Sequence, residues 1–340
     1  MVNSLYISKL EEALRREKYD EYYKYLCINY ATKLLGAKLP VIFDTIHLSH
    51  LLGIEPKELT KYLICEELYY NERLIPKKNG KMRTLCIPSV SLKYIQKWIL
   101  NNILYRVQIS DCATGFCRDK SILVNAKQHT SQNCIINLDI KDFFPSVSMD
   151  RIFRLFYYYG YTKEVSFVMA KLCTYKGQLP QGSPASPYLT NIVCLKLDKR
   201  LNQLAKKCNA TYTRYADDIT ISGDYKIQQS VDLIKDIIKD EGFEINQEKT
   251  RILFKHQKQE VTGLIVNNDI IHVDREYKRQ VKKEIYYCLK FGVSSHLKHI
   301  KSNKSFYKEH LYGKVYFINM IEPELGKHLL GILDQILWEY

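Results

Sequence analysis

The stretch Thr211-Tyr-Thr-Arg-Tyr-Ala-Asp-Asp-Ile-Thr-Ile-Ser222 places two adjacent carboxylates, Asp217 and Asp218, between two segments rich in β-branched and aromatic residues. Such residues favour strands, and the short break between them favours a hairpin turn. The sequence therefore predicts a β-hairpin with Ala216, Asp217 and Asp218 at its tip. An adjacent pair of acids is by itself most often a capped turn, so its meaning depends on the rest of the chain.

A third carboxylate, Asp139, ends the short apolar segment Cys134-Ile-Ile-Asn-Leu-Asp139, which we predict to be a strand. Acids beside Leu138 and Ile219 cost stability unless a cation compensates them. Magnesium suits this role, because it takes carboxylate oxygens and leaves positions open for phosphate oxygens. Two such ions can activate a 3′-hydroxyl and stabilise a leaving pyrophosphate, which is the chemistry of nucleotidyl transfer.

The rest of the chain predicts helices on both sides of these strands. Residues 1–75 favour helices interrupted at Pro40 and Pro56, and residues 77–81 favour a basic turn before a strand that stops at Pro88. Further helices are predicted from Ser89 onward, over 150–173, over 189–201 and over 227–240, and a further strand over 243–245.

The composition is that of a folded protein with a polyanionic partner. The chain has 340 residues, 51 Lys and Arg against 37 Asp and Glu, a net charge of +14, and 27 tyrosines suited to stacking on bases. Charge alone does not separate RNA from DNA or a membrane surface. The sequence lacks a run of about 18 apolar residues and a signal-peptide core, so we expect a cytoplasmic protein that does not enter a membrane.

The segment from Arg275 to Lys308 is the most basic part of the chain, with ten Lys or Arg and two acids. An apolar stripe at Tyr277, Val281, Ile285 and Cys288 predicts a helix with one buried face. Its basic faces fit either a solvated surface helix or a helix that follows nucleic-acid phosphates.

Four motifs occur in an order that resembles the reverse transcriptases: Asn137–Val147 (NLDIKDFFPSV), Leu179–Pro187 (LPQGSPASP), Tyr215–Asp218 (YADD) and Gly242–Thr250 (GFEINQEKT). The resemblance covers residues 76–265. It implies an α+β right-hand polymerase with fingers, a palm of antiparallel sheet and helices, and a helical thumb. The implied domains are an N-terminal helical region at 1–75, fingers and palm at 76–255, and primer grip and basic thumb at 256–340.

The resemblance also implies a set of catalytic residues. Asp139, Asp217 and Asp218 would be catalytic and would hold two Mg²⁺ ions, with the Ile140 carbonyl as a further ligand.

A nucleotide site follows from the same resemblance. Phe144 would exclude a 2′-hydroxyl, Gln181 would contact the incoming deoxynucleotide, and Lys249 would lie near its triphosphate as a general acid. Arg83, together with Lys77, Lys78 and Lys81, would clamp the triphosphate. A core phenylalanine, a generic basic turn and a surface lysine remain open alternatives for Phe144, the Lys77–Lys81 turn and Lys249.

Two shorter motifs resemble bacterial retron reverse transcriptases in particular: Asn125-Ala-Lys-Gln-His129 and Val261-Thr-Gly263. A lone Asn or His is more often a hydrogen-bonded structural residue. We expect primer, template or RNA binding from Asn125, His129, Tyr215, Val261, Thr262, Gly263, Lys278, Arg279, Lys282 and Lys283.

Membership of the retron group would imply an RNA-directed DNA polymerase that uses dNTPs to copy part of a structured non-coding RNA into single-stranded DNA (msDNA). Synthesis would be primed from an RNA 2′-hydroxyl, and the enzyme would act with an effector protein in defence against phage. We expect no RNase H, integrase or endonuclease domain, because the chain ends soon after the basic segment. The alternatives are another bacterial reverse transcriptase, of the abortive-infection or diversity-generating type, and an RNA–DNA-binding subunit that restrains an effector. The presence of all three aspartates favours catalysis.

Overall fold

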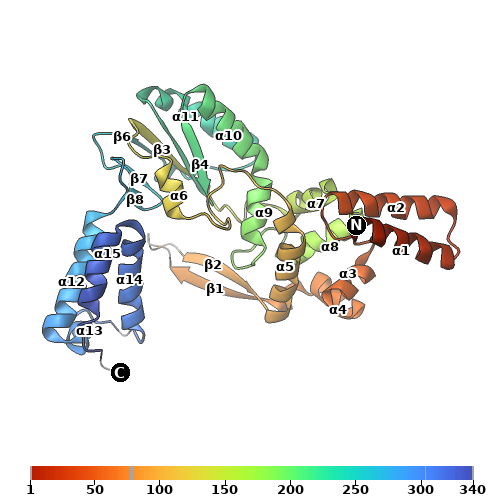
Figure 1. The fold of residues 1–340 in the computed structure, drawn as a ribbon, viewed down its shortest axis with the longest axis horizontal. Coiled ribbons are helices and arrows are strands. Elements are labelled where there is room, and N and C mark those ends of the chain that lie inside the picture. The colour runs from red at the N-terminus through yellow and green to blue at the C-terminus, as the bar shows by residue number, and fades with distance from the viewer. Residues whose placement is uncertain (1, 77–79, 81, 303, 339–340) are drawn as a thin grey trace. The chain divides into compact units, whose positions relative to one another are not determined.

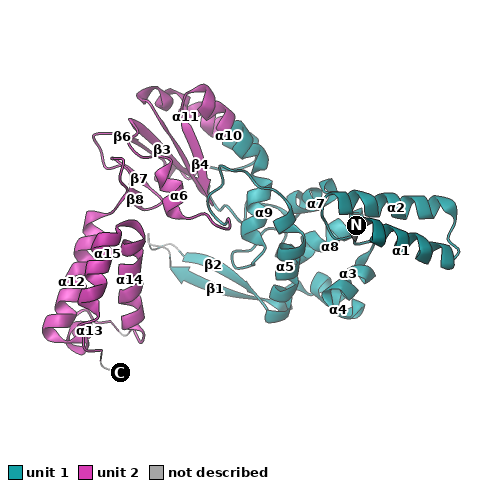
Figure 2. Ribbon diagram, viewed as in Figure 1, with its two compact units in different colours: residues 1–116, 140–200, 237–244 teal, residues 117–139, 201–236, 245–340 magenta. Residues whose placement is uncertain are grey.

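The computed structural model describes residues 2–76, 80, 82–302 and 304–338 (Figure 1). The chain forms two compact units that alternate along the sequence. Unit 1 comprises residues 1–116, 140–200 and 237–244, and unit 2 comprises residues 117–139, 201–236 and 245–340 (Figure 2). Helices and antiparallel sheets occur in both units, which confirms the predicted α+β class.

Unit 1 is mainly helical and carries one antiparallel hairpin. Several helices begin at an Asp, Ser or Thr whose side chain accepts a backbone N–H of the first turn, as at Asp20, Asp44 and Ser89. Its elements are α1 (Val2–Arg16), α2 (Glu21–Gly36), α3 (Thr45–Leu52), α4 (Pro56–Ile64), η1 (Glu66–Tyr69), β1 (Tyr70–Pro76), β2 (Met82–Pro88), α5 (Val90–Asn102), η2 (Leu104–Arg106), α7 (Met149–Tyr158), α8 (Lys163–Cys173) and α9 (Ser186–Val193).

Three helix predictions need correction. The helical region ends at Tyr69, because residues 70–76 pair with β2 in an antiparallel ladder and satisfy their backbone groups there. The helix predicted over 150–173 is two helices, since Gly160, with φ of +105°, follows α7 and Thr162 caps α8. The helix predicted over 189–201 is also two, α9 and α10 (Leu195–Lys207).

Unit 2 contains a four-stranded antiparallel sheet in the order β4-β5-β3-β6. Its strands are β4 (Thr211–Tyr215), β5 (Asp218–Gly223), β3 (Cys134–Asp139) and β6 (Arg251–Phe254), next to α6 (Ile122–Lys127), η3 (Tyr225–Ser230) and α11 (Val231–Asp240). The predicted hairpin and the strand 134–139 are confirmed, whereas the helix predicted from 227 begins as η3. The strand predicted over 243–245 is wrong: the strand of this region is β6, and residues 244 and 246 instead form single backbone bonds with Lys141 and Asp139.

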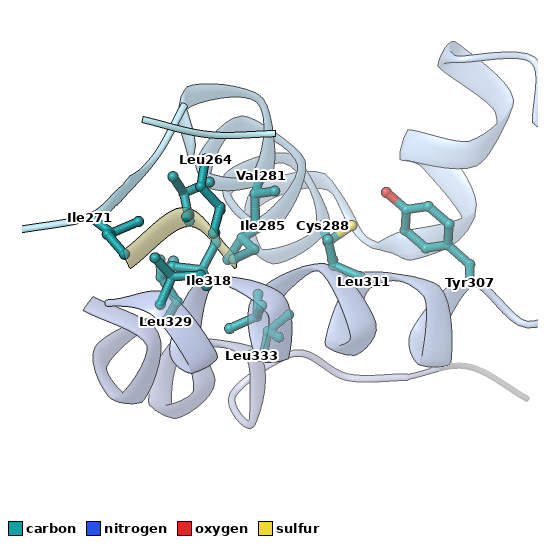
Figure 3. Close-up of a cluster of buried hydrophobic side chains, with 14 of the residues drawn as sticks. Leu264, Ile271, Val281, Ile285, Cys288, Tyr307, Leu311, Ile318, Leu329 and Leu333 are labelled. Carbon is teal, nitrogen blue, oxygen red and sulfur yellow. The ribbon is translucent and has the colours of Figure 1, made fainter. Parts of the chain in front are cut away.

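The last part of unit 2 joins a small sheet to a helical bundle. The sheet contains β7 (Glu260–Val261), β8 (Leu264–Ile265) and β9 (His272–Val273), and the helices are α12 (Arg275–Phe291), α13 (Val293–His299), α14 (Tyr307–Ile321) and α15 (Pro323–Leu333). The predicted stripe of α12 is buried at Val281, Ile285 and Cys288, where it faces Leu311 and Ile318 of α14 (Figure 3). None of the helices that the structure describes is long and apolar enough to span a membrane.

Candidate active site

The β4–β5 hairpin and strand β3 bring the three aspartates to one edge of the sheet. Asp139 and Asp218 are directly paired across β3 and β5, and Tyr215 is paired with Asp218 across β4 and β5. The turn between Tyr215 and Asp218 therefore contains only Ala216 and Asp217, and Ala216 has a left-handed φ of +58°. The predicted hairpin thus carries two acids at its tip and places a third opposite them.

A buried arginine, which the sequence analysis did not single out, supports this turn. Arg214 is fully buried, and its Nη1 donates a hydrogen bond to the Ala216 carbonyl at 3.1 Å. A charge at this depth is stabilised only by such polar partners. The sequence does contain a signal for it, an arginine in an otherwise uncharged strand three residues before the first of the two acids.

Lys249 lies against the first of the three aspartates. Its Nζ is 2.6 Å from Oδ2 of Asp139, a buried residue, and the backbone N–H of Asn246 donates to the Asp139 carbonyl at 2.8 Å. Burial alone lowers the pKa of Lys249, but the hydrogen bond and charge of Asp139, with further help from Asp217 and Asp218, raise it overall. Lys249 is therefore part of the carboxylate cluster.

The carboxylates repel one another. Desolvation of the Asp218 carboxyl, followed by the charges of Asp217 and Asp139, raises its pKa to about 7, although Lys249 opposes the shift and part of Asp218 stays open to solvent. A carboxyl pKa raised by desolvation and by neighbouring carboxylates indicates that the negative charge of the cluster is not fully compensated by nearby cationic groups. A cation is the natural complement of such a cluster.

The three aspartates fit a divalent cation in their chemistry. Their donors are hard carboxylate oxygens, which Mg²⁺ prefers. In the parts of the chain that the structure describes, no three His, Cys, Asp or Glu side chains are already arranged as a metal site. Since Oδ2 of Asp139 is ion-paired with Lys249, a cation at that oxygen would compete with Lys249. The Ile140 carbonyl, next along the chain, stays a prediction.

Unit 1 carries the predicted nucleotide-binding residues of the second motif. The backbone N–H of Cys86 on β2 donates to the Gln181 carbonyl at 2.8 Å, so the Gln181 turn packs on β2. Gly182 has φ of +135°, and a Cβ there would lie 2.5 Å from the Cys86 carbonyl oxygen, so only glycine fits. Arg83 is exposed on the same strand, whereas Lys77, Lys78 and Lys81 lie outside the described residues.

The two phenylalanines that follow Asp139 occupy different environments. Phe143 is buried and packs on Phe243, with ring centroids 6.0 Å apart. Phe144 is only half-buried and lies 5.8 Å from the exposed ring of Phe116. Phe143 therefore fills the core, and the accessible Phe144 ring is available for another role.

The two short motifs meet within unit 2. The Asn125 amide lies 3.5 Å from Thr262 Oγ1, and Thr262 donates to the carbonyl of Ile122 at 3.3 Å. His129 is buried between the hydroxyls of Ser222 and Thr213, at 2.6 and 2.7 Å. Asn125 and His129 are both buried, which fits the structural alternative better than direct contact with nucleic acid.

The basic residues of α12 divide into two groups. Arg279, Lys282 and Lys283 are exposed, and the side chain of Arg279 also pairs with Glu276 at 2.7 Å. Lys278 differs from the expectation, because its Nζ forms a largely buried ion pair with Glu322 at 2.8 Å. The surface available to a polyanion therefore excludes Lys278.

Comparisons with known proteins show the family to which the chain belongs. A family model described as reverse transcriptase (RNA-dependent DNA polymerase) matches residues 75–267. The chain is 34% identical to the retron Ec86 reverse transcriptase of Escherichia coli over 88% of this chain and 96% of that protein. It is 32% identical to the retron Mx162 reverse transcriptase of Myxococcus xanthus over 85% of this chain and 66% of that protein. Among solved structures, apo telomerase from Candida tropicalis is 12% identical, with a TM-score of 0.47 over 83% of this chain and 63% of that chain.

The family match spans more than half of the chain and contains all three aspartates, and the Escherichia coli relative is matched over nearly its whole length. Dependence on a divalent metal cation comes with the reverse transcriptase domain. The chain therefore belongs to the reverse transcriptase family, with its right-hand fold, and is a retron RNA-directed DNA polymerase.

Proposed function

We propose that this retron enzyme copies part of a structured non-coding RNA into single-stranded DNA (msDNA), starting from a 2′-hydroxyl of that RNA and using dNTPs. The observation that carries the proposal is the rung formed by Asp139 and Asp218, with Asp217 in the adjoining turn and Lys249 bound to Asp139. Membership of the retron group supports the choice of template and product.

The catalytic residues divide the chemistry between them. Asp139, Asp217 and Asp218 would hold two Mg²⁺ ions, with the Ile140 carbonyl as a further ligand. When bound, the ions supply charge neutralisation at the attacking hydroxyl and the leaving pyrophosphate. Lys249, once released from Asp139, stays protonated at neutral pH and can donate a proton to the pyrophosphate.

Selection of the incoming nucleotide falls to residues of unit 1. Gln181 and Gly182 form a turn that lets the backbone approach the nucleotide closely, and Arg83, with Lys81, binds the triphosphate. Phe144 excludes a 2′-hydroxyl from the sugar pocket. The half-exposed ring of Phe144 supports its assignment. The tight approach of Gly182 to Cys86 holds the Gln181 turn against β2, the strand that also carries Arg83, and this supports a shared role for the turn and Arg83.

Nucleic-acid binding falls to residues of unit 2. We assign the primer end to Tyr215 and to the Val261–Gly263 turn, and the folded RNA to the exposed Arg279, Lys282 and Lys283 of α12. The exposed charges support the second assignment, because RNA binding draws strongly on phosphate contacts. By the same group membership we extend the proposal to an effector protein as partner, to defence against phage and to the cytoplasm as compartment.

Replacing two of the aspartates tests the catalytic assignment. Asp217→Ala with Asp218→Ala should abolish deoxynucleotide incorporation while RNA binding persists, because these carboxylates hold metal rather than template. The matched control is Asp232→Ala with Asp236→Ala on α11, which removes the same charge from exposed positions. Incorporation within tenfold of the wild type by the Asp217/Asp218 variant would contradict the metal assignment.

Recovering the nucleic acid bound to the purified protein tests the template and the priming. Branched single-stranded DNA of one defined length, joined to RNA through a 2′-linkage, is the expected product. Unbranched DNA of mixed length would contradict priming from the RNA.

A further inference from the structure

The sheet face that carries Asp139 and Asp218 continues as a row of amide and hydroxyl side chains, in which Asn137 is half-buried and Thr213, Thr220 and Ser222 are buried. Side chains alternate between the two faces of a strand, so Asn137 lies on the same face as Asp139, and Thr220 on the same face as Asp218. Asn137 and Thr220 are cross-strand partners and form the next pair on this face after the two acids, and Thr213 of β4 is paired with Thr220.

Asn137 is the junction of this row. Thr220 Oγ1 donates to Asn137 Oδ1 at 3.2 Å, and Asn137 Nδ2 donates to the carbonyl of Glu260 at 2.9 Å. A carbonyl can only accept a hydrogen bond, which fixes the amide nitrogen toward Glu260. One side chain therefore connects β3, β5 and β7.

The strand that Asn137 holds leads directly into the Val261–Gly263 turn. Thr262 and Gly263 have left-handed φ values of +46° and +82°, so this turn has a defined shape. Asn125 and the Ile122 carbonyl hold its other side through Thr262. The turn is thus fixed from α6 on one side and from the catalytic sheet on the other.

The far end of the row is fixed as well. His129, just after α6, bonds to Ser222 and to Thr213 on the same sheet face. Residues 122–129 and the Val261–Gly263 turn therefore share one anchor, the polar row beneath the aspartates. The bond from Asn137 to Glu260 joins that row directly to the strand entering the turn.

We propose that Asn137 is a positioning residue that fixes the Val261–Gly263 turn relative to the catalytic aspartates. The inference rests on the proposed function, in which that turn holds the primer end. Asn137 is two residues from Asp139, about 7 Å along the strand, so a shift at its bond to Glu260 displaces the turn relative to the acids. A displacement of about 1 Å in a reacting group can cost about 100-fold in rate.

The test uses Asn137→Asp, which keeps the side-chain shape and the acceptor for Thr220 but places an oxygen against the Glu260 carbonyl. We expect kcat for primer extension to fall at least about tenfold, with KM for the dNTP changed less than about threefold. The fluorescence of 2-aminopurine at the primer 3′ end should change in the complex, because the base moves.

The matched control is Gln96→Glu in unit 1. Gln96 is buried, and its Nε2 donates to the Leu172 carbonyl at 2.9 Å, so the variant removes the same kind of bond away from the row. Gln96→Glu should lower the melting temperature. The fluorescence of the primer 3′ end should stay as in the wild type, and kcat should not fall selectively relative to KM for the dNTP. Equal loss of kcat in the two variants, with unchanged fluorescence in Asn137→Asp, would show a merely structural role and overturn the inference.

A milder variant tests the inference if Asn137→Asp does not fold. Thr220→Val removes only the hydroxyl donor to Asn137 and should lower kcat about threefold with the same change in fluorescence; wild-type values in this variant would overturn the inference. Normal extension by a folded Asn137→Asp overturns the inference alone, whereas a wild-type protein that extends no primer overturns the proposed function and the inference together.

Discussion

At the scale of single residues, Phe143 and Phe144 show how neighbours of one type enter different environments. The Phe143 ring is in the core against Phe243, and the Phe144 ring is half-exposed beside Phe116. A bulky ring beneath the sugar would leave no space for a 2′-hydroxyl. Such a ring must be accessible, as the Phe144 ring is and the buried Phe143 ring is not.

Truncating the exposed ring tests the gate. Phe144→Ala should raise the ratio of ribonucleotide to deoxynucleotide incorporation on an RNA template at least about tenfold, since a clash with one hydroxyl is worth more than about 1.4 kcal/mol. The control Phe143→Ala should instead destabilise the fold by about 3–5 kcal/mol and leave the ratio unchanged. An unchanged ratio in Phe144→Ala would remove Phe144 as the gate.

His129 makes the stability of unit 2 depend on pH. Burial lowers the pKa of His129 to about 3, from 6.5 for the unperturbed group. Between these values the unfolded chain binds one more proton than the folded chain, so the stability contribution is complete above pH 6.5 and is lost as the pH falls toward 3. The slope from this group is roughly 1.4 kcal/mol for each pH unit.

Denaturant unfolding of His129→Gln between pH 8 and pH 5.5 measures this effect. The variant should be less stable than the wild type at pH 8, because two hydrogen bonds are altered, and should lose less stability on acidification. The exposed His50→Gln is the control and should follow the wild-type curve. Parallel curves for His129→Gln and the wild type would show that His129 does not carry the linkage.

At the scale of elements, two turns, one in each unit, are held by hydrogen bonds from strand residues. The β4–β5 turn is supported by Arg214 through the Ala216 carbonyl, and the Gln181 turn is supported by the Cys86 N–H of β2. In both turns, a backbone carbonyl oxygen accepts a hydrogen bond from a residue of a strand. Such bonds fix the turns more firmly than their own short sequences can.

The approach of the Gln181 turn to β2 predicts a large effect of one methyl group. Gly182→Ala would place a Cβ 2.5 Å from the Cys86 carbonyl oxygen, in a backbone region that costs about 1–3 kcal/mol for a residue with a side chain. We expect the turn to move from β2 and KM for dNTPs to rise at least about tenfold.

A second glycine separates backbone strain from the steric clash. Gly177 also has a positive φ, of +77°, but nothing lies within 4 Å of an added Cβ. Gly177→Ala should therefore lose a similar amount of stability from strain and keep its KM. Equal KM values in the two variants would contradict the role of the close approach at Gly182.

At the scale of the whole molecule, the excess of 14 positive charges provides general attraction to nucleic acid, and recognition of one RNA requires charges in a particular place. On α12 the buried stripe fixes which basic residues face outward. Lys278 is neutralised by Glu322, so Arg279, Lys282 and Lys283 form the available basic face.

Reversing two charges on that face tests recognition. Arg279→Glu with Lys283→Glu should impair binding of the cognate RNA, and extension of a generic primer on a generic template should change much less. The control is Lys206→Glu with Lys207→Glu at the end of α10, two exposed lysines with the same change in net charge. Affinity for the cognate RNA and generic polymerase activity are measured at one fixed salt concentration.

The salt dependence of binding adds a second measurement. Each phosphate contact removed should lower the slope of log affinity against log salt by about one unit. Equal loss of cognate binding and generic activity in the α12 variant, or equal loss of binding in the α10 control, would show that this face attracts nucleic acid without recognising a particular RNA.

The sequence by itself determined the hairpin with Asp217 and Asp218, the strand ending at Asp139 and the buried stripe of α12, and its four motifs implied the α+β class through their resemblance to reverse transcriptases. These features depend on local alternation, on residue type and on motifs that lie close together in the chain. Local patterns also explain two of the wrong predictions, a helix reaching beyond Tyr69 and a strand over 243–245. Pairing with distant strands decides which segment becomes a strand, and local patterns do not contain that information.

Only the tertiary structure decided how distant residues combine at the site. It paired Lys249 with Asp139, buried Arg214 beneath the Ala216 carbonyl and removed Lys278 from the basic face through Glu322. It also joined Asn137 to Glu260, 123 residues apart in sequence. The physical reason is that burial and hydrogen bonding depend on partners brought together by folding, and neither the type of a residue nor its immediate neighbours specify those partners.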